Sequence, residues 1–505
     1  MIRISFLILI VFNVFLSAYW LLQGDIHYDV DVSRDLLVMD DIVRNSHLTL
    51  LGPRSGAISG IFHGPLWFYI NLPAFLIGGG DPLVVGWFWF LLSAIFLLII
   101  YWVSKKLFGF EVALLSVLLF SVNSIINPSI GLKNFYNPYG AVFLFPLFFW
   151  MFYRYLNTNA VKYLIICLFL LGLIIQFQMA FGIPLFVTIT FYLGYFLFQR
   201  RRLSHFLSYF ILLIPLSTFI VFDLKHNFLQ LNAFTQFFNK NNQAINLLDI
   251  FGNRARALLF DFFDLFSPGN NLLTISFAIC FIILFMVVLR KATHPFKKVY
   301  WLFGYLFLSF WIISLIYPGG VGNYFWPFLP LSIIIFCSFY KFIKREIFIA
   351  VFIILYMVNL YAGVLAIIEF KTDLNQRGPH SWAFNSYVAQ KIYEDAKGDF
   401  GYFNYSPDRF AYQQRYAMIY AGKNFPNITS FSSVKKPLTY LLEVDPPNDR
   451  PELSGINWRI SDVGIDRSPD QVFRFDFIKV EKYLLNSEEV KIEPNPYLLD
   501  SVFLR

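Results

Sequence analysis

A short segment behind the first apolar run holds the densest group of ionisable side chains in the first two thirds of the chain. It reads Asp25-Ile-His-Tyr-Asp-Val-Asp-Val-Ser-Arg-Asp35. If residues 30–42 are helical, Asp31 and Asp35 share a face at i, i+4, and Arg34 neighbours Asp31 at i, i+3. A partly desolvated carboxylate at a membrane surface can act as a general base. The alternative is a solvated loop whose acidic residues have no chemical role.

The same segment contains Asp29-Val-Asp31, a D-x-D triplet of the kind that binds a divalent metal and a sugar phosphate in some transferases. On a helix, residues two positions apart point about 200° apart, because each residue advances by about 100°. We therefore do not favour a metal site, and we expect no cofactor. The helix would also be amphipathic, with apolar side chains at Leu36, Met39 and Ile42, so we expect it to lie along the membrane interface.

The elements that must position this cluster are mostly membrane helices. The chain has 505 residues, of which 57% are hydrophobic and only 14% charged, whereas soluble domains have about 25% charged residues. This composition predicts an all-α polytopic membrane protein. We expect eleven crossings, at residues 6–22, 83–103, 112–126, 141–153, 163–175, 180–198, 206–222, 272–289, 299–316, 324–340 and 347–368.

The charged and sulfur-containing residues exclude other classes of protein. The net charge of +8 does not indicate nucleic acid, because the basic residues form short clusters between apolar runs. Cys167, Cys280 and Cys337 all lie inside apolar runs, which argues against a disulfide framework and a zinc site. No small-residue cleavage site follows the first apolar run, so we expect an uncleaved first helix rather than a signal peptide.

The basic clusters fall on alternate connections, and the positive-inside rule places them in the cytoplasm. The N-terminus is then cytoplasmic and the C-terminus extracytoplasmic, in the cell membrane. This topology allows one crossing before Lys105, so we interpret residues 64–77, which contain Asn71 and Pro73, as an interfacial helix. The alternative, a further crossing, would invert every later loop.

Under this topology the chain divides into a transmembrane domain (residues 1–370) and an extracytoplasmic domain (residues 371–505). The transmembrane domain has two large outer loops, at residues 23–82 and 223–270. The composition of the tail is that of a soluble protein and predicts a small α+β domain. Its expected strands are residues 400–405, 440–444 and 472–480, and its expected helix is residues 408–420.

Several motifs in order resemble the polyprenyl-phosphate-sugar glycosyltransferases of the GT-C fold, a group that includes the protein O-mannosyltransferase-like family and the aminoarabinose lipid A transferases. The resemblance covers roughly residues 1–370. The motifs that carry it are Asp31-Val-Ser-Arg-Asp35, Leu50-Leu-Gly-Pro53, Phe62-His-Gly-Pro-Leu-Trp-Phe-Tyr69, Asn137-Pro-Tyr139, Gln176-Phe-Gln178, Phe222-Asp-Leu-Lys-His-Asn227 and Asn323-Tyr-Phe-Trp-Pro327.

The resemblance implies transfer of a sugar, with inversion, from a polyprenyl-phosphate donor to an acceptor hydroxyl outside the membrane. The general base of the family falls on Asp31. The family usually has Glu or Gln at the next position, where this chain has Val32, and Asp29 or Asp35 would have to compensate. The acceptor stays open between a glycan, a lipid and a protein.

The leaving lipid phosphate is an anion, and nearby cations would stabilise it. The candidates are Arg34, His63, Lys225, His226, Arg254 and Arg256. Three of them have an alternative role. Arg254 and Arg256 could extend to lipid headgroups as interfacial residues, and His63 could only cap the interfacial helix.

Two other functions remain as alternatives. A transporter or flippase of a lipid-linked glycan needs ionisable residues inside its spans, and the predicted spans are almost free of charge. A metal-dependent oligosaccharyltransferase-like enzyme is the enzymatic alternative. A non-enzymatic scaffold would leave the acidic segment unexplained.

Overall fold

The computed structural model describes residues 2–55, 58–123, 135–240, 247–317, 322–496 and 498. The chain forms two compact units. The first comprises Met1–Tyr19, Leu48–Ile70 and Trp89–Ile368. The second comprises Trp20–His47, Asn71–Phe88 and Glu369–Arg505. The second unit therefore contains the tail together with two segments from the N-terminal part of the chain, and the predicted division at residue 370 stays a prediction.

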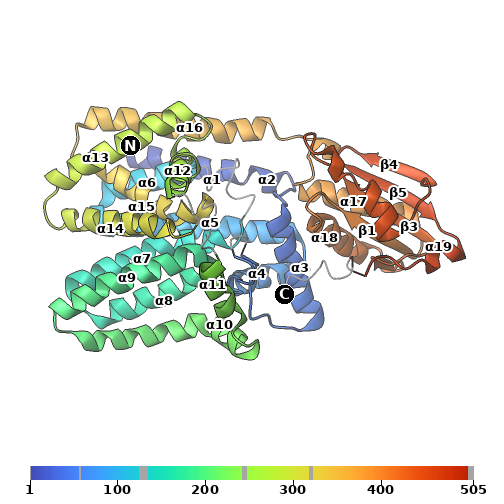
Figure 1. Cartoon of the computed structure of the whole chain (residues 1–505). Helices are drawn as coiled ribbons and strands as arrows, with labels where there is room; N and C mark the ends of the chain where they lie inside the picture. The colour runs from blue at the N-terminus through green and yellow to red at the C-terminus, as the bar shows by residue number, and fades with distance from the viewer. Residues whose placement is uncertain are drawn as a thin grey trace. The chain divides into compact units, whose positions relative to one another are not determined.

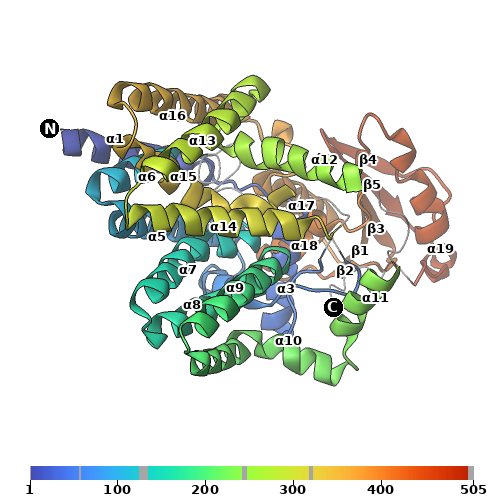
Figure 2. The same ribbon diagram turned by 60° about the vertical axis from the view of Figure 1, so that its left-hand side comes forward.

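The first unit is helical. Figures 1 and 2 show its helices, among which α9 and α14 run side by side. Two helices, α4 (Leu66–Ile77) and α5 (Pro82–Phe108), continue from one unit into the other. The remaining helices are α1 (Ile2–Ser17), α6 (Phe110–Val122), α7 (Pro138–Thr158), α8 (Val161–Phe177), α9 (Met179–Gln199), η1 (Leu203–Leu212), α10 (Leu213–Lys225), α11 (Leu229–Lys240), α12 (Leu247–Ala257), η2 (Leu258–Phe262), η3 (Phe263–Phe266), α13 (Asn271–Lys291), α14 (Phe296–Ser314), η4 (Gly322–Phe328), α15 (Leu329–Ser338), η5 (Phe339–Lys341) and α16 (Arg345–Ile368).

Within the described residues, eight helical segments are long and apolar enough to cross a membrane. They correspond to eight of the predicted crossings, and the other three predicted crossings overlap the shorter apolar helices α1, α6 and α8. Large apolar side chains such as Leu98, Phe191 and Trp301 are exposed on these helices, as lipid contact requires. A helical multi-pass membrane protein is thus confirmed, while the number of crossings stays a prediction.

The predicted interfacial segment forms α4, which has 12 residues. Its length is about 18 Å at 1.5 Å per residue, well short of the roughly 30 Å of a bilayer core. Pro73 lies inside this helix. These dimensions agree with a helix that does not cross the membrane by itself.

Aromatic side chains fill the core of the first unit. Phe181 on α9 contacts Phe145 on α7, Phe310 on α14 and Phe328 on η4, with ring centroids 5.1–5.3 Å apart. Edge-to-face and tilted contacts of this kind let large apolar side chains fill space between helices. They pack α7, α9 and α14 together.

The second unit has a five-stranded sheet with strand order β2-β1-β3-β5-β4. β1 pairs in parallel with β2 and β3, and β5 pairs antiparallel with β3 and β4. The strands are β1 (Phe400–Tyr405), β2 (Ser430–Ser432), β3 (Leu438–Val444), β4 (Gln471–Phe475) and β5 (Ile478–Leu484). Figure 1 shows α17 (Trp382–Ala396) and α18 (Tyr412–Ala421) beside the sheet. The short helices are α2 (Tyr19–Leu22), η6 (Leu374–Gln376), η7 (Gly422–Asn424), η8 (Pro451–Leu453), η9 (Trp458–Val463) and α19 (Ser487–Lys491).

The predicted α+β tail is confirmed, with two corrections. The strand predicted at residues 472–480 is a hairpin, because the chain turns at Asp476 and Phe477 and Phe475 pairs with Ile478. The predicted helix at residues 408–420 begins only at Tyr412. Before it, the Asp408 carboxylate accepts the backbone N–H of Phe410 at 2.9 Å, which stabilises a turn instead of a helix.

The segment at residues 20–47 is fastened to the tail within this unit. Tyr28 donates its N–H to the carbonyl of His380 at 2.7 Å and its hydroxyl to the carbonyl of Gln413 at 3.1 Å. The fully buried Asp25 carboxylate accepts from the Ser381 hydroxyl at 2.5 Å and from the Ala383 N–H at 3.0 Å. These contacts set the start of α3 (Val30–Asn45), the helix that carries the acidic cluster.

Candidate active site

α3 is the helix predicted from the acidic segment, and Asp29 is its N-cap. The Asp29 carboxylate accepts the N–H of Val32 at 2.9 Å, which satisfies one of the backbone donors left open at a helix start. The first carboxylate of the D-x-D triplet is therefore occupied as the cap of α3. Among the described residues, no group of three or more His, Cys, Asp and Glu side chains is placed to hold a metal ion. The expectation that no metal is required stays a prediction.

The apolar face of α3 is covered by protein. Leu36 and Met39 are 1% and 2% exposed, and α3 packs against α18 within the second unit. The apolar face is therefore buried in protein and not in lipid, and the expectation that the helix lies along the membrane interface stays a prediction. Amphipathic periodicity cannot distinguish burial in lipid from burial in protein.

Arg34 joins the two acidic side chains that the helical spacing predicted to be neighbours. Its Nη1 donates to Asp31 Oδ1 at 2.5 Å, and its Nη2 donates to Asp35 Oδ1 at 2.7 Å. The Asp31 side chain is 44% exposed, the Arg34 side chain 12% and the Asp35 side chain 7%. The predicted Asp31–Arg34–Asp35 cluster is thus formed, with one carboxylate accessible and the other buried.

The two carboxylates of the cluster differ in their electrostatic environment. Burial raises the pKa of Asp35 to about 7, although the Arg34 guanidinium opposes that rise. Asp31 has only its Oδ1 atom bonded to Arg34, and its Oδ2 atom has no hydrogen-bond partner within the described ranges. Asp31 therefore presents a carboxylate oxygen toward solvent, while Arg34 holds it in position.

The other motifs of the first loop, at Gly52 and Gly64, lie in the first unit and contact each other there. Gly52 donates its N–H to the carbonyl of His63, and His63 donates its N–H to the carbonyl of Pro53, both at 2.8 Å. Gly64 then donates to the carbonyl of Gln176 at 2.8 Å. A Cβ atom at Gly64 would lie 1.7 Å from Oε1 of Gln176, so this approach requires glycine.

Asn137 and Gln176, which come from two further motifs, lie at the same place, which is the break between α8 and α9. Asn137 donates its side-chain amide to the carbonyl of Phe177 at 2.6 Å. Gln176 donates to the carbonyl of Pro215 at 2.5 Å, and Asn323 donates to the hydroxyl of Tyr136 at 3.2 Å. An interrupted helix in a membrane protein needs such partners for its backbone groups. The motifs at Gly52, Gly64, Asn137 and Gln176 therefore have a common structural role.

The basic candidates have different surroundings. Nδ1 of His63 accepts the backbone N–H of Met179 at 3.4 Å. Met179 is the first residue of α9, so this bond is made to α9 and not to α4. Lys225 and His226 are exposed at the end of α10, and the imidazole of His226 stacks on Phe222 with ring centroids 4.1 Å apart. The neighbouring Asp223 accepts the N–H of Gln230 at 2.9 Å and so caps α11.

Arg254 is buried, with 1% of its surface exposed. It donates to the carbonyl of Ser314 at 3.0 Å and to the carbonyl of Tyr317, both at the end of α14. A cation at these carbonyls stabilises the C-terminus of the helix. An interfacial side chain extended to headgroups does not fit this burial. Arg256, two residues later, is exposed.

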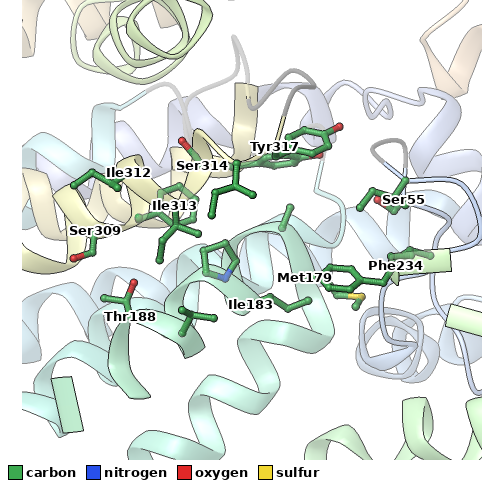
Figure 3. Close-up of a pocket in the computed structure, with 18 of the residues that line it drawn as sticks. Ser55, Met179, Ile183, Thr188, Phe234, Ser309, Ile312, Ile313, Ser314 and Tyr317 are labelled. Atoms are coloured by element: carbon green, nitrogen blue, oxygen red, sulfur yellow. The ribbon is translucent and has the colours of Figure 1, made fainter. Parts of the chain in front are cut away.

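Sequence reasoning missed an apolar cavity of about 630 Å³ in the first unit. Figure 3 shows Ile183 and Thr188 of α9 on one side and Ser309, Ile312 and Ile313 of α14 on the other. Ser55 of the first loop and Phe234 of α11 lie at one end. Because the lining comes from separate segments that are as apolar as the rest of the spans, no local pattern identifies it.

The acidic cluster of Asp29, Asp31, Arg34 and Asp35 belongs to the second unit. The other candidates, His63, Lys225, His226, Arg254 and Arg256, belong to the first unit, as does the apolar cavity. The structure thus brings the acidic cluster together as predicted. The basic residues are distributed over the first loop, the end of α10 and α12.

The fold and one sequence match define the class of protein. Residues 62–222 match the family model described as dolichyl-phosphate-mannose-protein mannosyltransferase. This region contains Gly64, Asn137 and Gln176, which meet at the break between α8 and α9. The chain is a multi-pass membrane glycosyltransferase with the GT-C fold.

Solved structures to which the chain is similar include two of ArnT from Cupriavidus metallidurans. The apo structure aligns with a TM-score of 0.61 and 10% identity, over 95% of this chain and 98% of that one. The structure bound to undecaprenyl phosphate aligns with a TM-score of 0.56 and 10% identity, over 96% and 98%. This likeness shows a shared fold. No curated protein sequence matches the chain.

Proposed function

We propose that the protein transfers a sugar from a polyprenyl-phosphate carrier to an acceptor hydroxyl at the extracytoplasmic face of the membrane, with inversion and with Asp31 as general base. The observation that carries this proposal is the exposed Asp31 carboxylate, which Arg34 holds at the start of α3. The GT-C fold and the undecaprenyl phosphate bound to ArnT support the choice of donor. The predicted topology, with a cytoplasmic N-terminus, belongs to the same proposal.

The apolar cavity suits the hydrocarbon tail of the donor. Its walls include Ile183, Ile312 and Ile313, and Phe191 at its side is 75% exposed, as expected for a surface that faces lipid. An isoprenoid chain gains free energy from burial against such side chains in proportion to its apolar area. The cavity would hold part of the tail and leave the phosphate at a polar boundary.

In the proposed reaction, Oδ2 of Asp31 takes the proton of the acceptor hydroxyl while the hydroxyl oxygen forms a bond to the anomeric carbon. The bond between that carbon and the phosphate oxygen breaks, and the electron pair leaves with the lipid phosphate. Attack from the opposite face inverts the anomeric configuration. The leaving phosphate is already a good anion, so no general acid is required.

The cations of the second outer loop are the proposed partners of the phosphate. Lys225, His226 and Arg256 are exposed and could approach an anion at the membrane surface. Arg254 acts differently, because its guanidinium is bonded to carbonyls of Ser314 and Tyr317, which line the cavity. We propose that Arg254 holds this part of the cavity wall in position.

The test compares Asp31→Asn with the wild type. Purified protein is incubated with polyprenyl-phosphate sugars and a cell-envelope extract as acceptor, and the release of polyprenyl phosphate is measured. Loss of a general base should reduce the rate by about 100-fold or more. Asp41→Asn is the matched control, because Asp41 lies on the same helix and hydrogen-bonds Asn45 instead of the cluster. Transfer by Asp31→Asn at the wild-type rate would exclude Asp31 as the base.

A further inference from the structure

The second unit contains a cavity of about 620 Å³ that the proposed mechanism does not use. It lies between the C-terminal part of α3, α17, α18, β1 and β2. Tyr393 and Tyr402, which are 2% and 3% exposed, line it, together with hydroxyl groups that include Ser430. The volume falls within the range of about 300–1,000 Å³ that is usual for small-molecule sites.

Three cationic side chains line this cavity, and its lining contains no carboxylate. Arg44 comes from α3, Arg415 from α18 and Lys423 from η7. Asp40 forms an ion pair with one of them, with its Oδ2 2.7 Å from Nε of Arg44. The local charge is therefore positive even when Asp40 is ionised.

Keeping two of these side chains positively charged inside the protein costs free energy. Burial lowers the pKa of Arg415 and the pKa of Lys423 from their ordinary values. Lys423 also donates to the carbonyl of Gly79 at 2.7 Å, which fixes its ammonium group at the cavity. An anion bound between these groups would offset the cost, because it supplies the opposite charge inside the protein.

The hydroxyl groups that line the cavity indicate which class of anion it would bind. Tyr393 donates to Ser430 Oγ at 2.6 Å, so hydroxyls from α17 and β2 already form one polar wall. Such groups exchange hydrogen bonds with sugar hydroxyls, and tyrosine rings offer flat apolar surface to a sugar ring. Cations, hydroxyls and aromatic rings together match a sugar that bears a phosphate or a carboxylate.

We propose that this cavity binds an anionic saccharide and that it recognises an acidic part of the acceptor. The second half of this inference rests on the proposed glycosyl transfer. Asp31 and Arg44 lie thirteen residues apart on α3, which corresponds to about 20 Å along the helix. The acceptor that reaches both is therefore an extended glycan or glycolipid whose acidic group is distant from the hydroxyl that reacts.

The test measures binding to the full-length protein in detergent by isothermal titration calorimetry, with glucose 1-phosphate, glucuronate, glucose and inorganic phosphate as probes. We expect saturable binding of the two anionic sugars and weaker binding of glucose and of inorganic phosphate. Lys423→Gln and Arg44→Gln should each weaken the binding of glucose 1-phosphate by about ten-fold, because each removes a charged hydrogen-bond donor. Lys423→Arg should restore most of the loss.

Arg474→Gln is the matched control, since Arg474 is exposed on β4 in the same unit and pairs with Asp445. It should leave the affinity unchanged, and thermal unfolding should confirm that all variants are folded. The proposal is overturned if glucose 1-phosphate does not bind, if Lys423→Gln and Arg44→Gln bind it like the wild type, or if inorganic phosphate binds equally well. Asp31→Asn should bind it normally, so failure of the transfer reaction and failure of this site are distinguishable.

Discussion

At the scale of single residues, the cluster of Asp31, Arg34 and Asp35 combines a predictable and an unpredictable feature. Spacings of three and four residues bring side chains together on any helix, so the two ion pairs follow from the sequence once α3 is helical. The unequal exposure of the two carboxylates does not. It depends on how α3 packs in its unit, and that packing makes Asp31 the accessible acid.

Asp35 should make the stability of the protein depend on pH. Its pKa is about 7 in the folded protein and 3.8 ordinarily, so the folded state binds more protons between these values. Its contribution to stability is therefore fully present below about pH 4. That contribution is lost as the pH rises through 7. We expect the Tm of the wild type in detergent to fall between pH 5 and pH 8, and Asp35→Asn to reduce that fall.

The same measurement on Asp41→Asn provides the control for a lost carboxylate on α3. Asp41→Asn should keep the pH dependence of the wild type. Parallel Tm profiles for the wild type and Asp35→Asn would show that Asp35 does not titrate in this range.

At the scale of elements, Asp29 is expected to act as a helix cap. Asp29→Ala should destabilise the protein by about 1 kcal/mol, because the N–H of Val32 loses its partner. Asp29→Asn should retain the stability, since asparagine caps helices about as well as aspartate. Denaturant unfolding measures both variants. If Asp29→Asn lost transfer while Asp29→Ala lost no stability, Asp29 would act on the substrate and not as a cap.

The elements of the tail show where sequence patterns are sufficient. β1 occupies the predicted residues 400–405, and the pairs Lys397-Gly398 and Ser406-Pro407 on its two sides contain the glycine and proline that typically end a strand. The hairpin of β4 and β5 was missed because apolar residues continue through its turn, where Asp476-Phe477 lacks the Asn-Gly or Asp-Gly pair typical of two-residue turns. The membrane helices were predictable because their apolar runs are long.

At the scale of the whole molecule, the cavity between α9 and α14 was beyond the reach of sequence reasoning. Its lining joins residues from Ser55 to Tyr324, and only the folded chain brings them together. The motif residues near it were recognisable because they are polar or glycine. Ile183, Ile312 and Ile313 carry no comparable signal in a chain that is 57% hydrophobic.

Ile183→Trp tests whether the cavity holds the tail of the donor. The larger side chain should fill part of the cavity and raise the KM for a long-chain polyprenyl-phosphate sugar by about ten-fold, with a smaller effect on a short-chain analogue. Steady-state kinetics with both donors measure the difference. Ile282→Trp is the control, because Ile282 is 53% exposed on α13 and does not line the cavity. An equal effect of Ile183→Trp on both donors would place the tail elsewhere.

The second unit is assembled from separate stretches of the chain, and this has a consequence for protein engineering. Its α3 and its sheet are far apart in the sequence, yet Asp25 and Tyr28 are bonded to residues 380–413. A truncation after residue 370 would spare every predicted crossing and still remove the partners that set the start of α3. A chimera that exchanges tails between related enzymes would therefore need to exchange Trp20–His47 and Asn71–Phe88 with them.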